Sequence, residues 1–197
     1  MGSCATTDYV PDTGWRDNDW TSVFYENWFG RQLRAMGEPP IVDDSDLAGH
    51  QSRFRLLILP SFRPASAYRV DQNIDGTGSL RAVVLDGAGG YEPGNIAQSV
   101  SRTLDPEELD QLESVISEAS LDFLPREGEP EGVREIDGET VIRICMDGTT
   151  YVFEYLANGR RHYLERSCII EENALRDLVD VTTALAPSLL DDRETAE

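Results

Sequence analysis

Residues 140–168 read TVIRICMDGTTYVFEYLANGRRHYLERSC, three runs rich in β-branched and aromatic residues that are separated by two short turns. The turns are Asp147-Gly148 and Asn158-Gly159. Such dipeptides favour two-residue hairpin loops, because both turn positions need a positive φ. The stretch therefore predicts a three-stranded antiparallel meander. The predicted strands are 140–146, 149–156 and 160–168.

Helix and strand signals elsewhere add to this meander. Residues 19–36 repeat large apolar side chains at helical spacing and end at Gly37. A second helix is predicted to begin after Asp105, with Pro106 at the first helical position and Glu108 completing a capping box. The remaining predictions are strands at 53–59, 66–70, 80–86 and 96–104, a loop at 126–138 and a last helix at 171–186.

This order of elements predicts an α+β fold with antiparallel sheet and three main helices. A strands-then-helix unit occurs twice, which suggests two related halves. We expect residues 1–18 to be a flexible tether, 19–187 a single α+β domain and 188–197 a frayed acidic tail. No run approaches the roughly 18 apolar residues of a membrane span, so no transmembrane segment is expected.

The first predicted helix carries a stripe of large apolar residues. We expect the stripe to pack into the core, and a partner-binding groove is the alternative. Its members are Trp20, Val23, Phe24, Trp28, Leu33 and Met36.

The charge of the chain limits its partners. Acidic residues outnumber basic ones 37 to 17, which gives a net charge of −20. Such a surface repels phosphate backbones, so nucleic-acid binding is not expected. It favours a cationic partner or divalent ions, or serves only solubility. Every basic residue is arginine, which excludes Schiff-base lysines and the lysine of a P-loop.

The segment MGSCATT at the start of the chain suggests a lipid anchor at Cys4. Gly-Ser-Cys resembles the end of a bacterial lipobox. The same residues also match an N-myristoylation pattern, with Gly2 and Thr6 in place and Cys4 open to palmitate. We expect a lipoprotein of the periplasm or cell envelope, and the alternative is a cytoplasmic protein without an anchor.

The other two cysteines form an even pair if Cys4 carries lipid. In the predicted meander, Cys145 faces Thr150 and Cys168 faces Thr149, so the middle strand would separate the two cysteines by about 10 Å. A disulfide needs Cα atoms within roughly 7 Å. Both a disulfide and two buried thiols remain open.

Residues 71–79, DQNIDGTGS, match the first nine positions of a calcium loop. Asp71, Asn73 and Asp75 are the candidate ligands. The twelfth position, where a bidentate glutamate should close the shell, is Ala82. The alternative is a polar hairpin turn, because turns favour the same residue types.

Catalytic patterns are sparse, and an enzyme is not the favoured interpretation. The candidates are Glu154 and His162. With Asn158-Gly159 as the turn, Tyr155 pairs with His162, so His162 has no carboxylate partner in this register. The glycine-rich run LDGAGGYEPGN (85–95) lacks the helix that a dinucleotide site needs, so we expect a structured loop that packs Tyr91.

The C-terminal half resembles a group of uncharacterised, exported bacterial proteins. The resemblance rests on Asp147, Gly148, Tyr151, Glu154, Gly159, His162 and Arg166, and on the segments ENWFGRQLRAMGEP, LPSF and GGYEPG. Arg161 stands where the group has an aromatic residue. The resemblance implies export but no established activity.

Together these observations predict a non-enzymatic envelope protein that presents an acidic surface to a basic protein partner. The alternatives are a calcium-binding module at Asp71, Asn73 and Asp75, and an enzyme that acts through Glu154 or His162.

Overall fold

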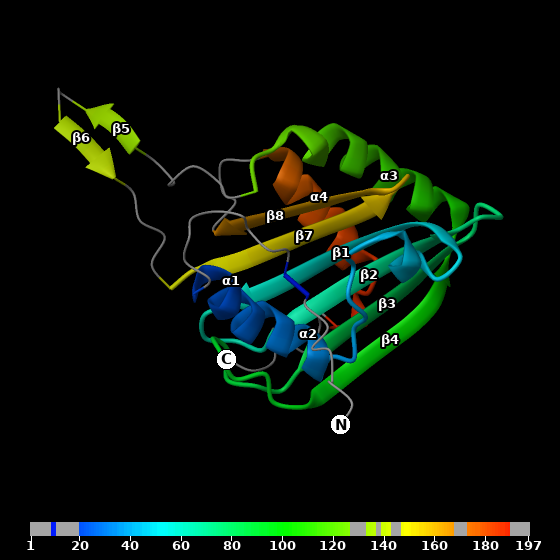
Figure 1. The fold of residues 1–197 in the computed structure, drawn as a ribbon, viewed down its shortest axis with the longest axis horizontal. Helices are drawn as coiled ribbons and strands as arrows, with labels where there is room; N and C mark the ends of the chain where they lie inside the picture. The colour runs from blue at the N-terminus through cyan, green and yellow to red at the C-terminus, as the bar shows by residue number, and fades with distance from the viewer. Residues whose placement is uncertain are drawn as a thin grey trace.

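The computed structural model describes residues 9–10, 20–126, 133–136, 139–142, 147–167 and 173–189. These residues form an antiparallel six-stranded sheet with strand order β4-β3-β2-β1-β7-β8. The helices α1 and α2 cross in front of this sheet, and α4 lies behind it (Figure 1). The predicted α+β class is confirmed.

The described elements have the following bounds. The main sheet contains β1 (His50–Pro60), β2 (Ser66–Asn73), β3 (Gly78–Leu85), β4 (Ile96–Leu104), β7 (Thr149–Ala157) and β8 (Arg160–Ser167). A separate hairpin contains β5 (Val133–Ile136) and β6 (Glu139–Ile142). The helices are α1 (Trp20–Tyr25), the π-helical η1 (Glu26–Gly30), α2 (Arg31–Ala35), α3 (Pro106–Ala119) and α4 (Asn173–Ala184), with short 3-10 turns η2 (Asp44–Leu47) and η3 (Leu121–Phe123).

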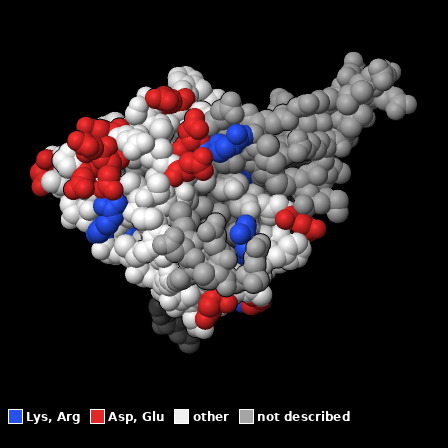
Figure 2. All heavy atoms as spheres, turned by 180° about the vertical axis from the view of Figure 1, so that it is seen from behind, with Lys and Arg blue, Asp and Glu red and all other residues white. Residues whose placement is uncertain are grey.

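Helix α3 begins as the sequence predicts. Asp105 and Glu108 form the capping box, in which the Asp105 backbone N–H donates to Glu108 Oε2 at 2.9 Å. Leu109, Leu112 and Ala119 turn inward, whereas the acidic Glu107, Asp110 and Glu118 are exposed. Seen from behind, the molecule shows several groups of acidic atoms and few basic ones (Figure 2).

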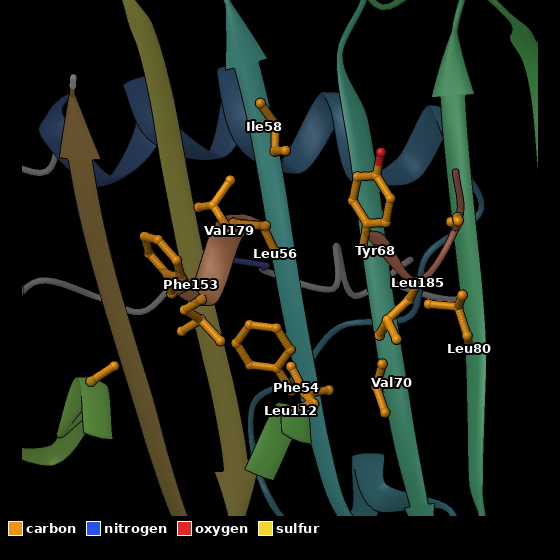
Figure 3. Packing of buried hydrophobic residues seen from close by; sticks show 14 of the residues in the cluster. Phe54, Leu56, Ile58, Tyr68, Val70, Leu80, Leu112, Phe153, Val179 and Leu185 are labelled. Atoms are coloured by element: carbon orange, nitrogen blue, oxygen red, sulfur yellow. The ribbon is translucent and has the colours of Figure 1, made fainter. Parts of the chain in front are cut away.

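Alternate residues of the strands point to opposite faces of the sheet and contribute to two separate hydrophobic cores. Phe54, Leu56 and Ile58 of β1 pack toward α3 and α4 (Figure 3). Leu57 and Leu59 point to the other face, where they meet α2 and the η1 segment. The predicted last helix forms as α4, and the residues that it and the following turn bury are Leu175, Leu178, Val179, Thr182 and Leu185.

The predicted three-stranded meander is only partly right. The register across Asn158-Gly159 is as expected, and both residues have positive φ. However, the second neighbour of β7 in the sheet, besides β8, is β1 and not the predicted first strand of the meander. The described part of that predicted strand is β6, which pairs with β5, a strand that forms inside the predicted loop 126–138. Leu59 therefore occupies the place opposite Thr150 that the prediction gave to Cys145.

The reason lies in β1, which is buried on both faces from Ser52 to Pro60. A strand buried in this way needs a neighbour on each edge as well as cover on each face. Beyond the end of β1, the backbone N–H of Ser61 donates to Gly148 O at 3.1 Å and the hydroxyl of Ser61 at 2.8 Å, which ties the segment before β7 to β1.

The first predicted helix forms, and its predicted inward face is partly right. Leu33 and Met36 of the predicted stripe are buried, but Val23 and Phe24 are 54% and 37% exposed. Phe29, which the prediction left out, is buried instead. The π-helical segment accounts for the shift, because its wider turn brings Phe29 inward in place of the four-residue repeat.

The π-helical turn encloses the carboxylate of Glu26. That carboxylate accepts from the backbone N–H groups of Tyr9 and Val10 at 2.8 and 2.9 Å, and from Arg34 at 2.5 Å. A Cβ at Gly30 would collide with Glu26 Oε1, so a larger residue there would displace this carboxylate from its hydrogen bonds.

Several sequence predictions fall largely outside the described residues. Cys4, Cys145 and Cys168 lie outside them, as does most of the predicted tether 1–18. Tyr9 and Val10, within that tether, are buried beside Phe29. As to membrane insertion, no described helix is long and apolar enough to cross a bilayer.

Candidate functional site

A groove of about 470 Å³ lies between α3 and the face of the sheet formed by β1, β2 and β7. Its size falls within the range of ligand pockets. The apolar lining is Phe54, Val70, Leu109, Leu112, Ile116, Leu121 and Phe123. The polar lining is Gln51, Ser52, Gln72, Glu113, Ser117, Ser120, Asp122 and Tyr155.

Two carboxylates face this groove, Glu113 from α3 and Asp122 from η3, and its lining contains no arginine. Partial burial of the Glu113 carboxyl raises its pKa, and the nearby charge of Asp110 adds to this effect. Glu113 also accepts a hydrogen bond from the side-chain amide of Gln72. The groove is therefore acidic over an apolar floor.

His162 lies beside the groove and has a carboxylate partner that the sequence did not reveal. Its Nε2 lies 3.1 Å from Asp122 Oδ1, and its ring stacks on Tyr155 with 6.4 Å between centroids. Burial raises the pKa of Tyr155, and a hydrogen bond with Ser52 opposes this rise. Asp122 was missed because η3 approaches β8 from outside the sheet.

The polar groups of the groove mostly bond to one another. Ser52 donates to Gln72 Oε1 at 3.0 Å, and Ser120 donates to the Ser117 carbonyl at 3.3 Å. The hydroxyls of Ser52 and Ser120 thus donate to groups other than His162 in these two hydrogen bonds. Chemically, the site offers an apolar floor, neutral hydrogen-bonding groups and two carboxylates, which suits the binding of a cationic group that carries an apolar body.

A second cluster of charges lies on the opposite face of the sheet, beside the residues that follow α2. Its three carboxylates, Glu38, Asp71 and Glu154, are buried. We call these acids and the arginines that bind them the buried ion layer. Five arginines surround them: Arg53, Arg55, Arg69, Arg81 and Arg161.

The geometry of the buried ion layer is close. Glu154 Oε2 accepts from Arg55 Nε at 2.7 Å, and Glu154 Oε1 accepts from Arg161 at 2.8 Å. Arg69 bridges two acids, with 2.9 Å to Glu38 and 3.0 Å to Asp71. Buried charges of this kind need such partners, because an unpaired charge away from water is costly.

The same arginines bind backbone carbonyls of the N-terminal segment. Arg81 donates to Met36 O at 2.7 Å and Arg55 donates to Pro39 O at 2.5 Å. Arg161 donates to the carbonyl oxygen of Tyr9 at 2.6 Å. The guanidinium group suits this role, since it has five donors in a fixed plane. The buried ion layer therefore fastens the N-terminal segment to the sheet and is structural.

The predicted calcium ligands take part in separate contacts. Asp71 belongs to the buried ion layer, and Asn73 Oδ1 lies 2.7 Å from His50 Nδ1. Asp75 is exposed and accepts from the Thr77 backbone N–H and hydroxyl at 3.0 and 2.7 Å, which lowers its pKa. Among the described residues, no group of three His, Cys, Asp or Glu side chains could hold a metal ion. The calcium site is therefore untested, and the pairing of Asp71 with two arginines weighs against it.

The two predicted catalytic residues lie on opposite faces of the sheet. Glu154 is in the buried ion layer, whereas His162 is at the groove, so they cannot act on one substrate.

Comparisons with known proteins assign no activity to either region. No family model matches the chain, and no curated protein matches it significantly.

Proposed function

We propose that this protein is a non-enzymatic binding protein that presents an acidic surface to a cationic protein partner, such as a basic cell-wall hydrolase or a toxin. An envelope location with a lipid at Cys4 belongs to the same proposal. The observation that supports it most is the charge of α3 and the turn after it. Residues 105–125 contain seven acidic residues and no basic residue.

Six of these seven acidic residues are exposed. Among the described ion pairs, α3 contributes only Glu108, which binds Arg102 at 2.7 Å. Glu107, Asp110 and Glu118 therefore present their charge to solvent. Charge of one sign on one face raises the rate of encounter with a partner of opposite sign, and salt reduces this effect.

The groove beside α3 supports binding more than catalysis. Its carboxylates and amides are recognition groups, and the described residues around His162 supply no nucleophile with a bonded base. The acidic helix and the groove lie on the same side of the sheet, so one partner would contact both.

The test is to recover partners from a cell-envelope extract with the immobilised full chain and then measure each affinity with purified protein. We expect the affinity to fall with rising salt concentration and in the variant Glu107→Gln/Glu118→Gln. The control Asp44→Asn/Glu92→Gln removes the same charge away from α3 and should bind normally. The proposal would be refuted if the affinity did not change with salt concentration. It would also be refuted if the affinity fell equally in the α3 variant and in the control variant.

A further inference from the structure

The groove between α3 and the sheet combines apolar and acidic residues, whereas the exposed face of α3 offers acidic charge alone. Its floor is apolar, with Phe54 and Leu112 almost fully buried, while Glu113 and Asp122 stand at its polar side. At its edge, Phe123 is 87% exposed and lies among the groove residues. An exposed aromatic next to an apolar groove indicates a contact surface.

The charge of the groove selects the occupant. An anion would face Glu113 and Asp122 with no arginine in the lining to offset them. A purely apolar group would remove water from these carboxylates without replacing their hydrogen bonds, which is unfavourable. A cationic side chain beside an apolar one satisfies both surfaces, and Phe123 could add a cation–π contact.

The length of the groove favours a peptide over a compact ligand. On α3 the lining runs from Leu109 to Ser117 and continues to Phe123 in the next turn. The helical part alone spans about 12 Å at 1.5 Å per residue. An extended chain covers this distance in about four residues. An open groove of this length fits a short strand or loop of a partner.

Building on the proposed function, we infer that this groove receives a short extended segment of the cationic partner in which apolar side chains alternate with arginine or lysine. The apolar side chains rest on the partly exposed Ile116 and the exposed Phe123, above the buried Phe54 and Leu112, and the basic ones meet Glu113 and Asp122. Specificity comes from the groove, and the remaining acids of α3 supply long-range attraction.

The test measures binding of labelled hexapeptides to the full chain by fluorescence anisotropy. The first peptide alternates leucine and arginine, the second alternates serine and arginine, and the third alternates leucine and glutamate. We expect the first to bind more tightly than the second and the third not to bind. This order separates apolar recognition from simple charge attraction.

Two variants of equal charge change then test whether the peptide binds in the groove. Glu113→Gln/Asp122→Asn should weaken binding of the leucine–arginine peptide about tenfold, as the loss of two partly shielded ion pairs would. Glu107→Gln/Glu118→Gln removes equal charge from α3 outside the groove and should have a smaller effect. Thermal unfolding of each variant verifies the fold.

A steric variant provides an independent readout. Ser117→Trp places a large side chain in the groove without a change in charge, so it should abolish the preference for leucine over serine. Ser114 is also exposed on α3 but does not line the groove, so Ser114→Trp is the control.

The outcomes separate the two proposals. If the serine–arginine peptide binds as well as the leucine–arginine peptide and both charge variants weaken it equally, the groove inference is overturned and the acidic surface remains. If no peptide binds, the groove inference is also overturned. The proposed function is then judged only by the salt dependence of the protein partner.

Discussion

Replacing Glu154 by glutamine should destabilise the protein strongly, because it leaves buried guanidinium groups without their charge partner. Arg55 and Glu154 are 0% and 1% exposed, and Glu154 also binds Arg161. Breaking a buried ion pair from one side costs about 3–5 kcal/mol. For a chain of this size that corresponds to a fall in Tm of roughly 6–20 °C.

The composition of the buried ion layer predicts an asymmetry. Three carboxylates face five arginines, so the loss of an acid increases the excess of positive charge, whereas the loss of an arginine reduces it. In Arg55→Met, Glu154 keeps Arg161, and Glu38 keeps Arg69. We therefore expect Glu154→Gln to cost more stability than Arg55→Met.

The assay is a double-mutant cycle by urea unfolding at neutral pH, with tryptophan fluorescence and circular dichroism as probes. The double variant Arg55→Met/Glu154→Gln should be more stable than the sum of the single changes predicts, by about 1–3 kcal/mol. Glu118→Gln, an exposed change on α3, should lie within about 0.5 kcal/mol of the unmodified protein. A cost below about 1 kcal/mol for Glu154→Gln, or no coupling in the cycle, would refute a paired, buried layer.

Three further predictions concern single residues. Cys4→Ser should move the protein from the membrane fraction to the soluble fraction and abolish incorporation of labelled fatty acid; unchanged partitioning would contradict a lipid at Cys4. Millimolar calcium should not raise the Tm, because Asp71 is already bound by two arginines; a calcium-specific rise that is lost in Asp75→Ala would contradict this. Binding of the leucine–arginine peptide should weaken as the pH falls through the raised pKa of Glu113, because only the ionised carboxyl attracts the cation. Glu113→Gln should flatten this part of the pH profile, and an unchanged profile would contradict the role of Glu113.

The parts of the fold that the sequence predicted are those with local signals. The start of α3 depends on Asp105 and Glu108, which are three residues apart, and the register of β7 and β8 depends on the dipeptide between them. The pairing of β1 with β7 was missed because it joins residues such as Arg55 and Glu154, which are distant in sequence. Pairing β7 with the predicted strand 140–146 would cost less loop-closure entropy than pairing it with β1, because the two segments are close in sequence. That arrangement would leave one edge of the buried strand β1 without a neighbour.

The candidate site was harder to predict for the same reason. The groove joins β1, β2, β7, α3 and η3, so no single segment carries its pattern. A signal for the buried ion layer was present, however. In FRLLILP the charged Arg55 lies inside an apolar strand, and in YVFEYL the charged Glu154 lies inside another. A charge at the centre of an apolar strand predicts a buried partner of opposite sign, because burial without one is too costly.

The two charge systems are linked through β1. Arg53 and Arg55 point to the buried ion layer, while Phe54 between them points to the floor of the groove. In the described ion pairs, the arginines of the layer bind its own buried acids and none of the acids of α3, so the exposed acids of α3 keep their charge at the surface. The pairing that fixes β1 in place on one face also holds the groove on the other face in shape. A groove that is formed before binding loses less entropy when a partner enters. The arginines of the layer therefore support binding without touching the partner.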